Sequence, residues 1–129
     1  MQYASKDIAF SLAGVLAEHG GKDVVVLDVA IQSGWTDYFV IATSTSSTHM
    51  RGIARYLDER ASELGVSRFN KPGIADDEEW ILVDFGDVIV HIMADRARGF
   101  YELEKLWFQS ALVQVVPSQT GIEHSMVTS

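Results

Sequence analysis

The chain has 129 residues, contains no cysteine and carries a formal net charge of −8. This length is typical of a single domain with a substantial hydrophobic core, and the lack of cysteine excludes disulfides, thiol catalysis and cysteine-ligated zinc. The arginines lie among acidic residues along the sequence, so we expect no basic cluster that binds nucleic acid through its phosphates. A basic protein partner fits this charge better.

Apolar runs are too short for a membrane helix, which needs roughly 20 residues. The segment from Ile8 to Ala17 has helical spacing, and Glu18 and His19 follow it where a signal peptide would be cleaved. We therefore expect a cytoplasmic protein without membrane contact.

Hydrophobic periodicity and turn residues predict the elements of the first half of the chain. A polar run over 44–48 offers several helix N-caps. The predicted elements are a helix over Ser5–His19, a strand over Val24–Val29, a turn at Ser33-Gly34, a strand over Asp37–Thr43 and a helix over about His49–Leu64.

Two β-branched runs around Asp84-Phe85-Gly86-Asp87 predict a β-hairpin, because Gly86 can adopt a positive φ. Two registers are open. A two-residue loop of Phe85 and Gly86 places Trp80, Leu82, Ile89 and His91 on one face. A type I turn with Gly86 as a bulge instead places Trp80 with Leu82, Val88, Val90 and Ile92. Both registers give mostly apolar faces, so we expect the sheet to be covered on both sides.

After the hairpin, a helix is predicted over Arg96–Phe108, and the chain from Val113 onward resembles a loose tail. We therefore expect a domain over 1–112 and a tail over 113–129. The order of elements predicts an α/β fold, a single domain in which helices flank a compact mixed β-sheet.

Three groups of residues are candidates for chemistry. Asp84 and Asp87 could hold a divalent metal in a nucleotidyltransferase-like enzyme, but Gly-rich phosphate loops are absent from the sequence and Asp is common in turns. Ser46 or Ser47 with His49 could form an anion site or a nucleophile and base, although N-capping is the simpler role. Trp80 suits a protein interface and a core equally well.

Three motifs together resemble one family. Residues 36–43 followed by Ser46 and His49, residues 79–91 and residues 98–107 are similar, in order and separation, to the ribosomal silencing factors, also called the Iojap family. The resemblance implies a domain with a nucleotidyltransferase-like fold but without catalytic activity or cofactor. It implies binding to the large ribosomal subunit through its protein fourteen, a steric block to joining of the small subunit when nutrients are short, and a homodimer when free.

The resemblance also assigns candidate partner-binding positions, residue by residue. They are Trp80, Asp84, Phe85, Asp87, His91, Tyr101, Glu102, Glu104 and Trp107. Two positions depart from the family pattern, which usually has Gly where this chain has Ser44 and a larger polar residue where it has Gly99.

Overall fold

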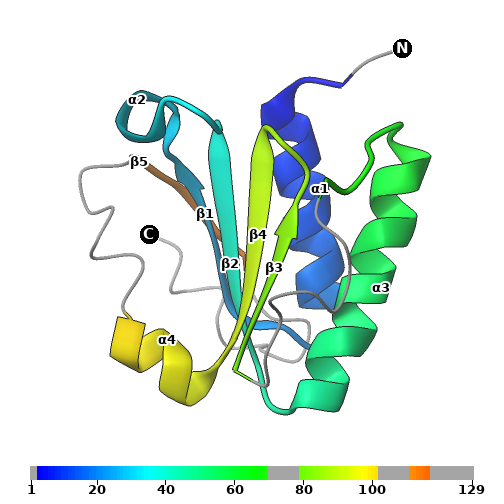
Figure 1. Ribbon diagram of the computed structural model, residues 1–129, viewed down its shortest axis with the longest axis vertical. Coiled ribbons are helices and arrows are strands. Elements are labelled where there is room, and N and C mark those ends of the chain that lie inside the picture. The colour runs from blue at the N-terminus through cyan, green and yellow to red at the C-terminus, as the bar shows by residue number, and fades with distance from the viewer. Residues whose placement is uncertain (1–2, 70–78, 102–110, 117–129) are drawn as a thin grey trace.

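The computed structural model describes residues 3–69, 79–101 and 111–116 (Figure 1). Four helices and five strands lie in these ranges. They are α1 (Ser5–Glu18), β1 (Lys22–Asp28), α2 (Ala30–Ser33), β2 (Tyr38–Ser44), α3 (Ser47–Glu63), β3 (Trp80–Asp84), β4 (Val88–Ala94), α4 (Asp95–Tyr101) and β5 (Ala111–Val116).

The five strands form one sheet in the order β3-β4-β2-β1-β5. β2 and β4 are parallel, whereas the other neighbouring pairs are antiparallel. The parallel pair requires a crossover, which α3 and β3 supply between β2 and β4. The predicted α/β fold with a mixed sheet is confirmed, and β3 lies at the edge of the sheet.

Helices cover one face of the sheet, which we call the inner face. α1 and α3 pack side by side against it, and α4 lies on the opposite side (Figure 1). Leu12 and Leu16 of α1 and Ile53 and Leu57 of α3 are fully buried there. Each pair is four residues apart, which places both side chains on the same stripe of the helix.

The opposite side, which we call the outer face, is also apolar. Its buried residues form a second cluster, which comprises Val25, Leu27, Val29, Phe39, Ile41, Ile89, Met93 and Ala97. Trp80 and Leu82 of the edge strand pack against this cluster and are partly buried. Both faces of the sheet therefore contribute to the core, as the apolar strands predict.

The hairpin has the face predicted by the two-residue loop, but a different pair of loop residues. Trp80 pairs with Met93 and Leu82 pairs with His91, so Trp80 shares a face with His91, as the two-residue loop predicts. The loop itself is Gly86-Asp87, one residue later than expected, because Phe85 N–H donates to the carbonyl of Val88 at 3.0 Å. Gly86 has φ +88°, and a Cβ there would lie 3.0 Å from the Phe69 ring.

Some boundaries differ from the predictions. The Ser33-Gly34 turn is preceded by the short helix α2, and Gly34 ends it in the left-handed conformation. Residues 113–116, which the expected tail includes, belong to β5 and pair with β1, so the sheet extends past residue 112. Residues 102–108 of the last predicted helix and 117–129 of the tail lie outside the described residues. No helix within the described ranges is long and apolar enough to cross a membrane.

Candidate functional site

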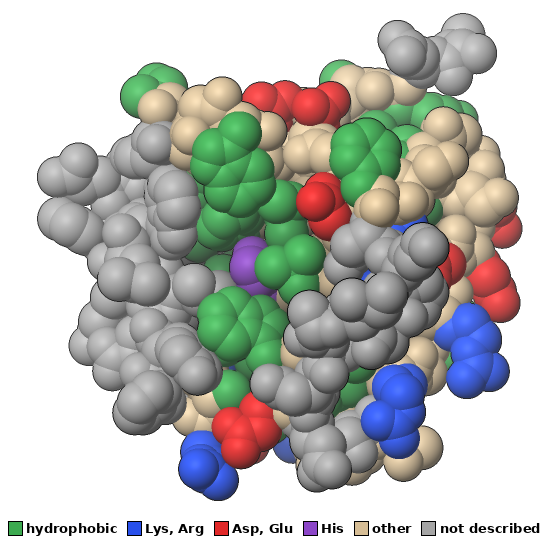
Figure 2. Space-filling view, in the orientation of Figure 1, with side chains coloured by type: hydrophobic (Ala, Val, Ile, Leu, Met, Phe, Trp, Pro, Cys, Tyr) green, Lys and Arg blue, Asp and Glu red, His purple; other side chains and the backbone are tan. Residues whose placement is uncertain are grey.

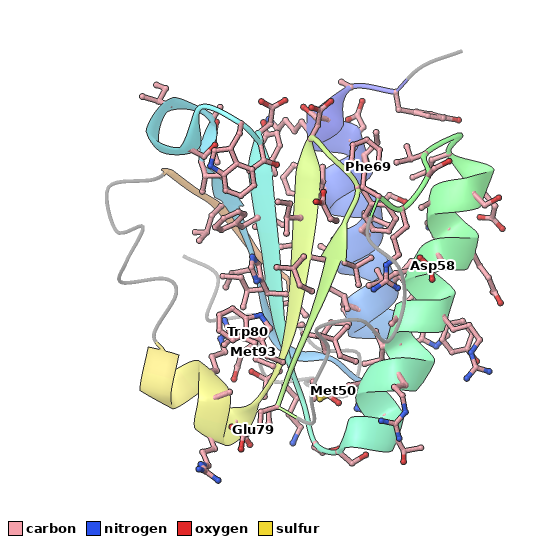
Figure 3. All side chains as sticks on the ribbon, in the orientation of Figure 1. Met50, Asp58, Phe69, Glu79, Trp80 and Met93 are labelled. Atoms are coloured by element: carbon pink, nitrogen blue, oxygen red, sulfur yellow. The ribbon has the colours of Figure 1, made fainter. Side chains whose placement is uncertain are left out.

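The outer face presents an aromatic group at the sheet edge. Trp80 Nε1–H donates a hydrogen bond to His91 Nδ1 at 3.1 Å, and the two rings are 5.8 Å apart. Figure 3 shows Trp80 beside Met93, its partner in the register. In Figure 2, hydrophobic side chains gather around a histidine on this face. The edge strand and the strand next to it thus hold the indole in one orientation.

His91 is buried, with 5% of its surface exposed. Burial lowers the pKa of its imidazole to about 4, so the ring is neutral near pH 7. Because Nδ1 accepts the bond from Trp80, the proton resides on Nε2, which has no hydrogen-bond partner in the part of the chain that is described. The Phe39 ring meets the imidazole edge to face at 4.8 Å. Its burial gives His91 a role in positioning Trp80, and direct contact of His91 with a partner stays a prediction.

Helix α4 closes the end of the outer face near Trp80. Arg98 donates to the carbonyl of Asp23 at 2.6 Å and to Thr43 Oγ1 at 3.0 Å, which ties α4 to the ends of β1 and β2. Arg96 pairs with Glu79, the residue before Trp80, at 3.3 Å. These contacts fix the position of the helix that carries the third motif.

A second tryptophan extends the outer face, and our sequence interpretation missed it. Trp35 is 63% exposed, and its ring lies 6.3 Å from that of Phe39. Ile31, on α2, is 94% exposed. The signal in the sequence is a Trp that directly follows the turn glycine Gly34, where a large apolar side chain has little to pack against. Trp is among the residues most enriched in interface hot spots.

The hairpin acids stabilise the turn. Gly86 N–H donates to Asp84 Oδ1 at 2.8 Å, while the carbonyl of Asp87 accepts from the N–H groups of Asp37 and Tyr38. Asp84 and the exposed Asp87 remain at the surface, at the end of β3 opposite Trp80. Phe85 is buried on the inner face, and its contact with a partner stays a prediction.

The third motif is described only in part. Tyr101 is the last residue of α4. Glu102, Glu104 and Trp107 lie outside the described residues.

The side chains at the start of α3 do not form the nucleophile and base that the sequence left open. Ser46 is the N-cap, since its side chain accepts from His49 N–H at 3.0 Å, which confirms the capping role. The imidazole of His49 instead contacts Ser44, whose Oγ lies 2.6 Å from Nδ1. Its Nε2–H donates to the carbonyl of His19 at 2.8 Å. Because Ser44 is 1% exposed, this array joins the end of α1 to the start of α3 and offers no accessible nucleophile.

Replacing Ser44 with Ala is expected to lower the free energy of unfolding by about 1–3 kcal/mol, because it leaves a ring nitrogen of His49 without its donor. Urea unfolding at pH 7 measures the change. The matched control is Thr45→Ala, which removes an exposed hydroxyl from the neighbouring residue. Equal stability of the two variants would contradict a structural role for the Ser44 hydroxyl.

The fold and the site together define a small α/β binding protein. The aromatic residues of the outer face suit recognition of another macromolecule. The Asp84 carboxylate serves the hairpin turn, and the described residues contain no group of three or more side chains that could hold a metal ion.

Comparison with known proteins gives the family. Residues 2–128 match the family model "Ribosomal silencing factor during starvation", so the chain belongs to this family of non-enzymatic ribosome silencing factors. The ribosomal silencing factor of Treponema pallidum is 37% identical over 107 residues, which cover 81% of this chain and 93% of that protein. The enzyme interpretation of Asp84 and Asp87 is therefore wrong.

Two further relatives extend the comparison. A mouse protein, "Mitochondrial assembly of ribosomal large subunit protein 1", is 34% identical over 110 residues, which cover 81% of this chain and 48% of the mouse protein. A crystal structure of a protein from Chromobacterium violaceum superposes with a TM-score of 0.75 at 30% identity, over 81% of this chain and 87% of that one.

Proposed function

We propose that this chain binds the large ribosomal subunit through its protein fourteen and sterically blocks joining of the small subunit when nutrients are limiting. The observation that carries the proposal is the outer face, where Trp80 is held by His91 at the edge of the sheet, level with the end of β2, and Trp35 is exposed just before the start of β2. A steric block requires a surface and affinity, and no catalytic group.

Charge supports the same partner. The chain has a net charge of −8, and Asp84 and Asp87 lie on the hairpin that includes the edge strand. Opposite charge speeds association with a basic ribosomal protein. The name of the mouse relative, which refers to the ribosomal large subunit, agrees with the proposed binding target.

We also propose that the protein is cytoplasmic and that it forms a homodimer when it is not bound to the ribosome. Contact with the ribosome involves no recognition of a particular nucleic-acid sequence. Sedimentation equilibrium of the purified chain measures the oligomeric state, and a monomer at all concentrations would contradict the dimer.

Addition of the purified chain to separated ribosomal subunits is expected to reduce the amount of joined ribosomes and to leave the chain bound to the large subunit. Sucrose-gradient sedimentation measures both. As a control, the chain is added after the subunits have joined. A steric block acts on free subunits, so its effect on ribosomes that are already joined should be smaller. Unchanged joining at saturating protein would refute the proposal.

A further inference from the structure

The outward side of α3 carries two exposed arginines. Arg51 and Arg55 are exposed and lie one helical turn apart on the same side. Among the described residues, neither makes an ion pair or a hydrogen bond. Arg60, further along the helix, pairs with Glu63 at 3.0 Å and also donates to Ser11. The N-terminal half of α3 therefore exposes two arginines outside any described ion pair, and the exposed Glu59 follows one turn after Arg55.

The helix itself adds to this positive charge. The first turn of α3 contains no acidic residue, and the positive end of the helix dipole lies beside Arg51. Figure 2 shows Lys and Arg side chains over the lower part of α3, and acidic side chains over its upper part.

A stacked aromatic pair lies next to these arginines. Tyr56 follows Arg55, is 46% exposed and stacks on the His19 ring, with ring centres 3.7 Å apart and planes 9° from parallel. His19 belongs to the end of α1, which His49 joins to the start of α3 through the His19 carbonyl. The fold thereby brings an exposed aromatic ring and two free guanidinium groups to one surface.

A lysine at the start of β1 lies three residues after His19 in the chain. Lys22 is exposed at the start of β1 and is in register with Thr43, near the end of the strand that leads into α3. We call the surface of His19, Lys22, Arg51, Arg55 and Tyr56 the α3 basic face. α3 packs on the inner face of the sheet, so the α3 basic face points away from the outer face.

We propose that the α3 basic face contacts the phosphate backbone of ribosomal RNA, without reading its sequence. Guanidinium groups match phosphate geometry, and a base can stack on an exposed tyrosine. This rests on the proposed function, in which an acidic protein docks on a particle rich in RNA. Most of its surface would be repelled by RNA, so the α3 basic face determines which side can lie against it.

The double variant Arg51→Gln/Arg55→Gln tests the inference. Its affinity for purified large subunits is expected to fall about 10-fold at roughly 0.1 M salt, and the slope of log affinity against log salt to decrease by about 2, one for each lost phosphate contact. Its affinity for isolated ribosomal protein fourteen is expected to equal that of the wild type. Urea unfolding verifies the fold, and little loss of stability is expected because both arginines are exposed and neither forms an ion pair or hydrogen bond among the described residues.

Lys6→Gln is the matched control, because it removes an exposed cation from the first turn of α1, at the end of that helix opposite His19. It should leave the salt dependence near that of the wild type. An unchanged salt slope in the arginine variant would overturn the inference and leave the proposed function intact. An equal loss of affinity for isolated protein fourteen would also overturn it, since the face would then bind protein. Failure of the wild type to bind large subunits would overturn the proposed function as well.

Discussion

Replacing Trp80 with alanine is expected to weaken binding to the large ribosomal subunit about 30-fold, the effect of losing a hot-spot tryptophan worth about 2 kcal/mol. The indole is partly buried against the outer face and fixed by His91, so it can enter an interface with little loss of side-chain freedom. Cosedimentation with purified large subunits measures the affinity, and unfolding in urea shows whether the variant keeps its fold.

Two further variants distinguish direct contact of the Trp80 indole with the ribosome from the effect of its hydrogen bond to His91. Trp80→Phe keeps an aromatic ring but loses the N–H that His91 accepts, so its affinity is expected to lie between those of the wild type and Trp80→Ala. Tyr3→Ala removes an exposed aromatic side chain near the N-terminus and serves as the matched control. If Trp80→Ala binds as tightly as Tyr3→Ala, the indole is not part of the interface.

Acidification from pH 7 to pH 4 is expected to cost the protein about 3 kcal/mol of stability through His91 alone. Burial lowers the pKa of His91 in the folded chain to about 4, whereas an unfolded histidine titrates near 6.5. Between these values the unfolded chain binds more protons, so stability falls as the pH falls. The contribution is fully present above pH 6.5 and is lost as the pH approaches 4.

His91→Asn isolates this effect. Asparagine does not titrate, and its amide oxygen can take the place of Nδ1 as acceptor for Trp80. Urea unfolding at pH 7 and pH 4 compares the two proteins, and the wild type should lose about 3 kcal/mol more than His91→Asn over this interval. Equal losses would show that His91 does not remain neutral in the folded chain.

Local patterns predicted much of the fold. β-Branched runs identified β1 to β4, and apolar spacing identified α1 and α3, since each pattern reflects the face that the element buries. β5 was missed because an edge strand at the end of the chain is recognised through its pairing with β1, and β1 is more than eighty residues away in sequence. The loop at Gly86 was placed one residue early, because several short turns are compatible with one glycine.

Less of the candidate site than of the fold could be predicted from the sequence. The family motif singled out Trp80, but sequence order could not show that His91 is its buried hydrogen-bond partner, or that Phe85 points to the other side of the sheet. The arginines of α3 appeared to be neutralised because acids surround them in the sequence. Among the described residues, neither Arg51 nor Arg55 forms an ion pair. The nearby stack of His19 on Tyr56 depends on how two helices meet.

The position of β5 has a consequence for how the chain folds. β1, near the N-terminus, is flanked by β2 on one side and by β5 on the other. Until residues 111–116 have been synthesised, one side of β1 has no strand to pair with and exposes unpaired main-chain groups. Folding therefore includes a late, long-range step that closes this edge, and such steps are slow because a long loop must first be ordered.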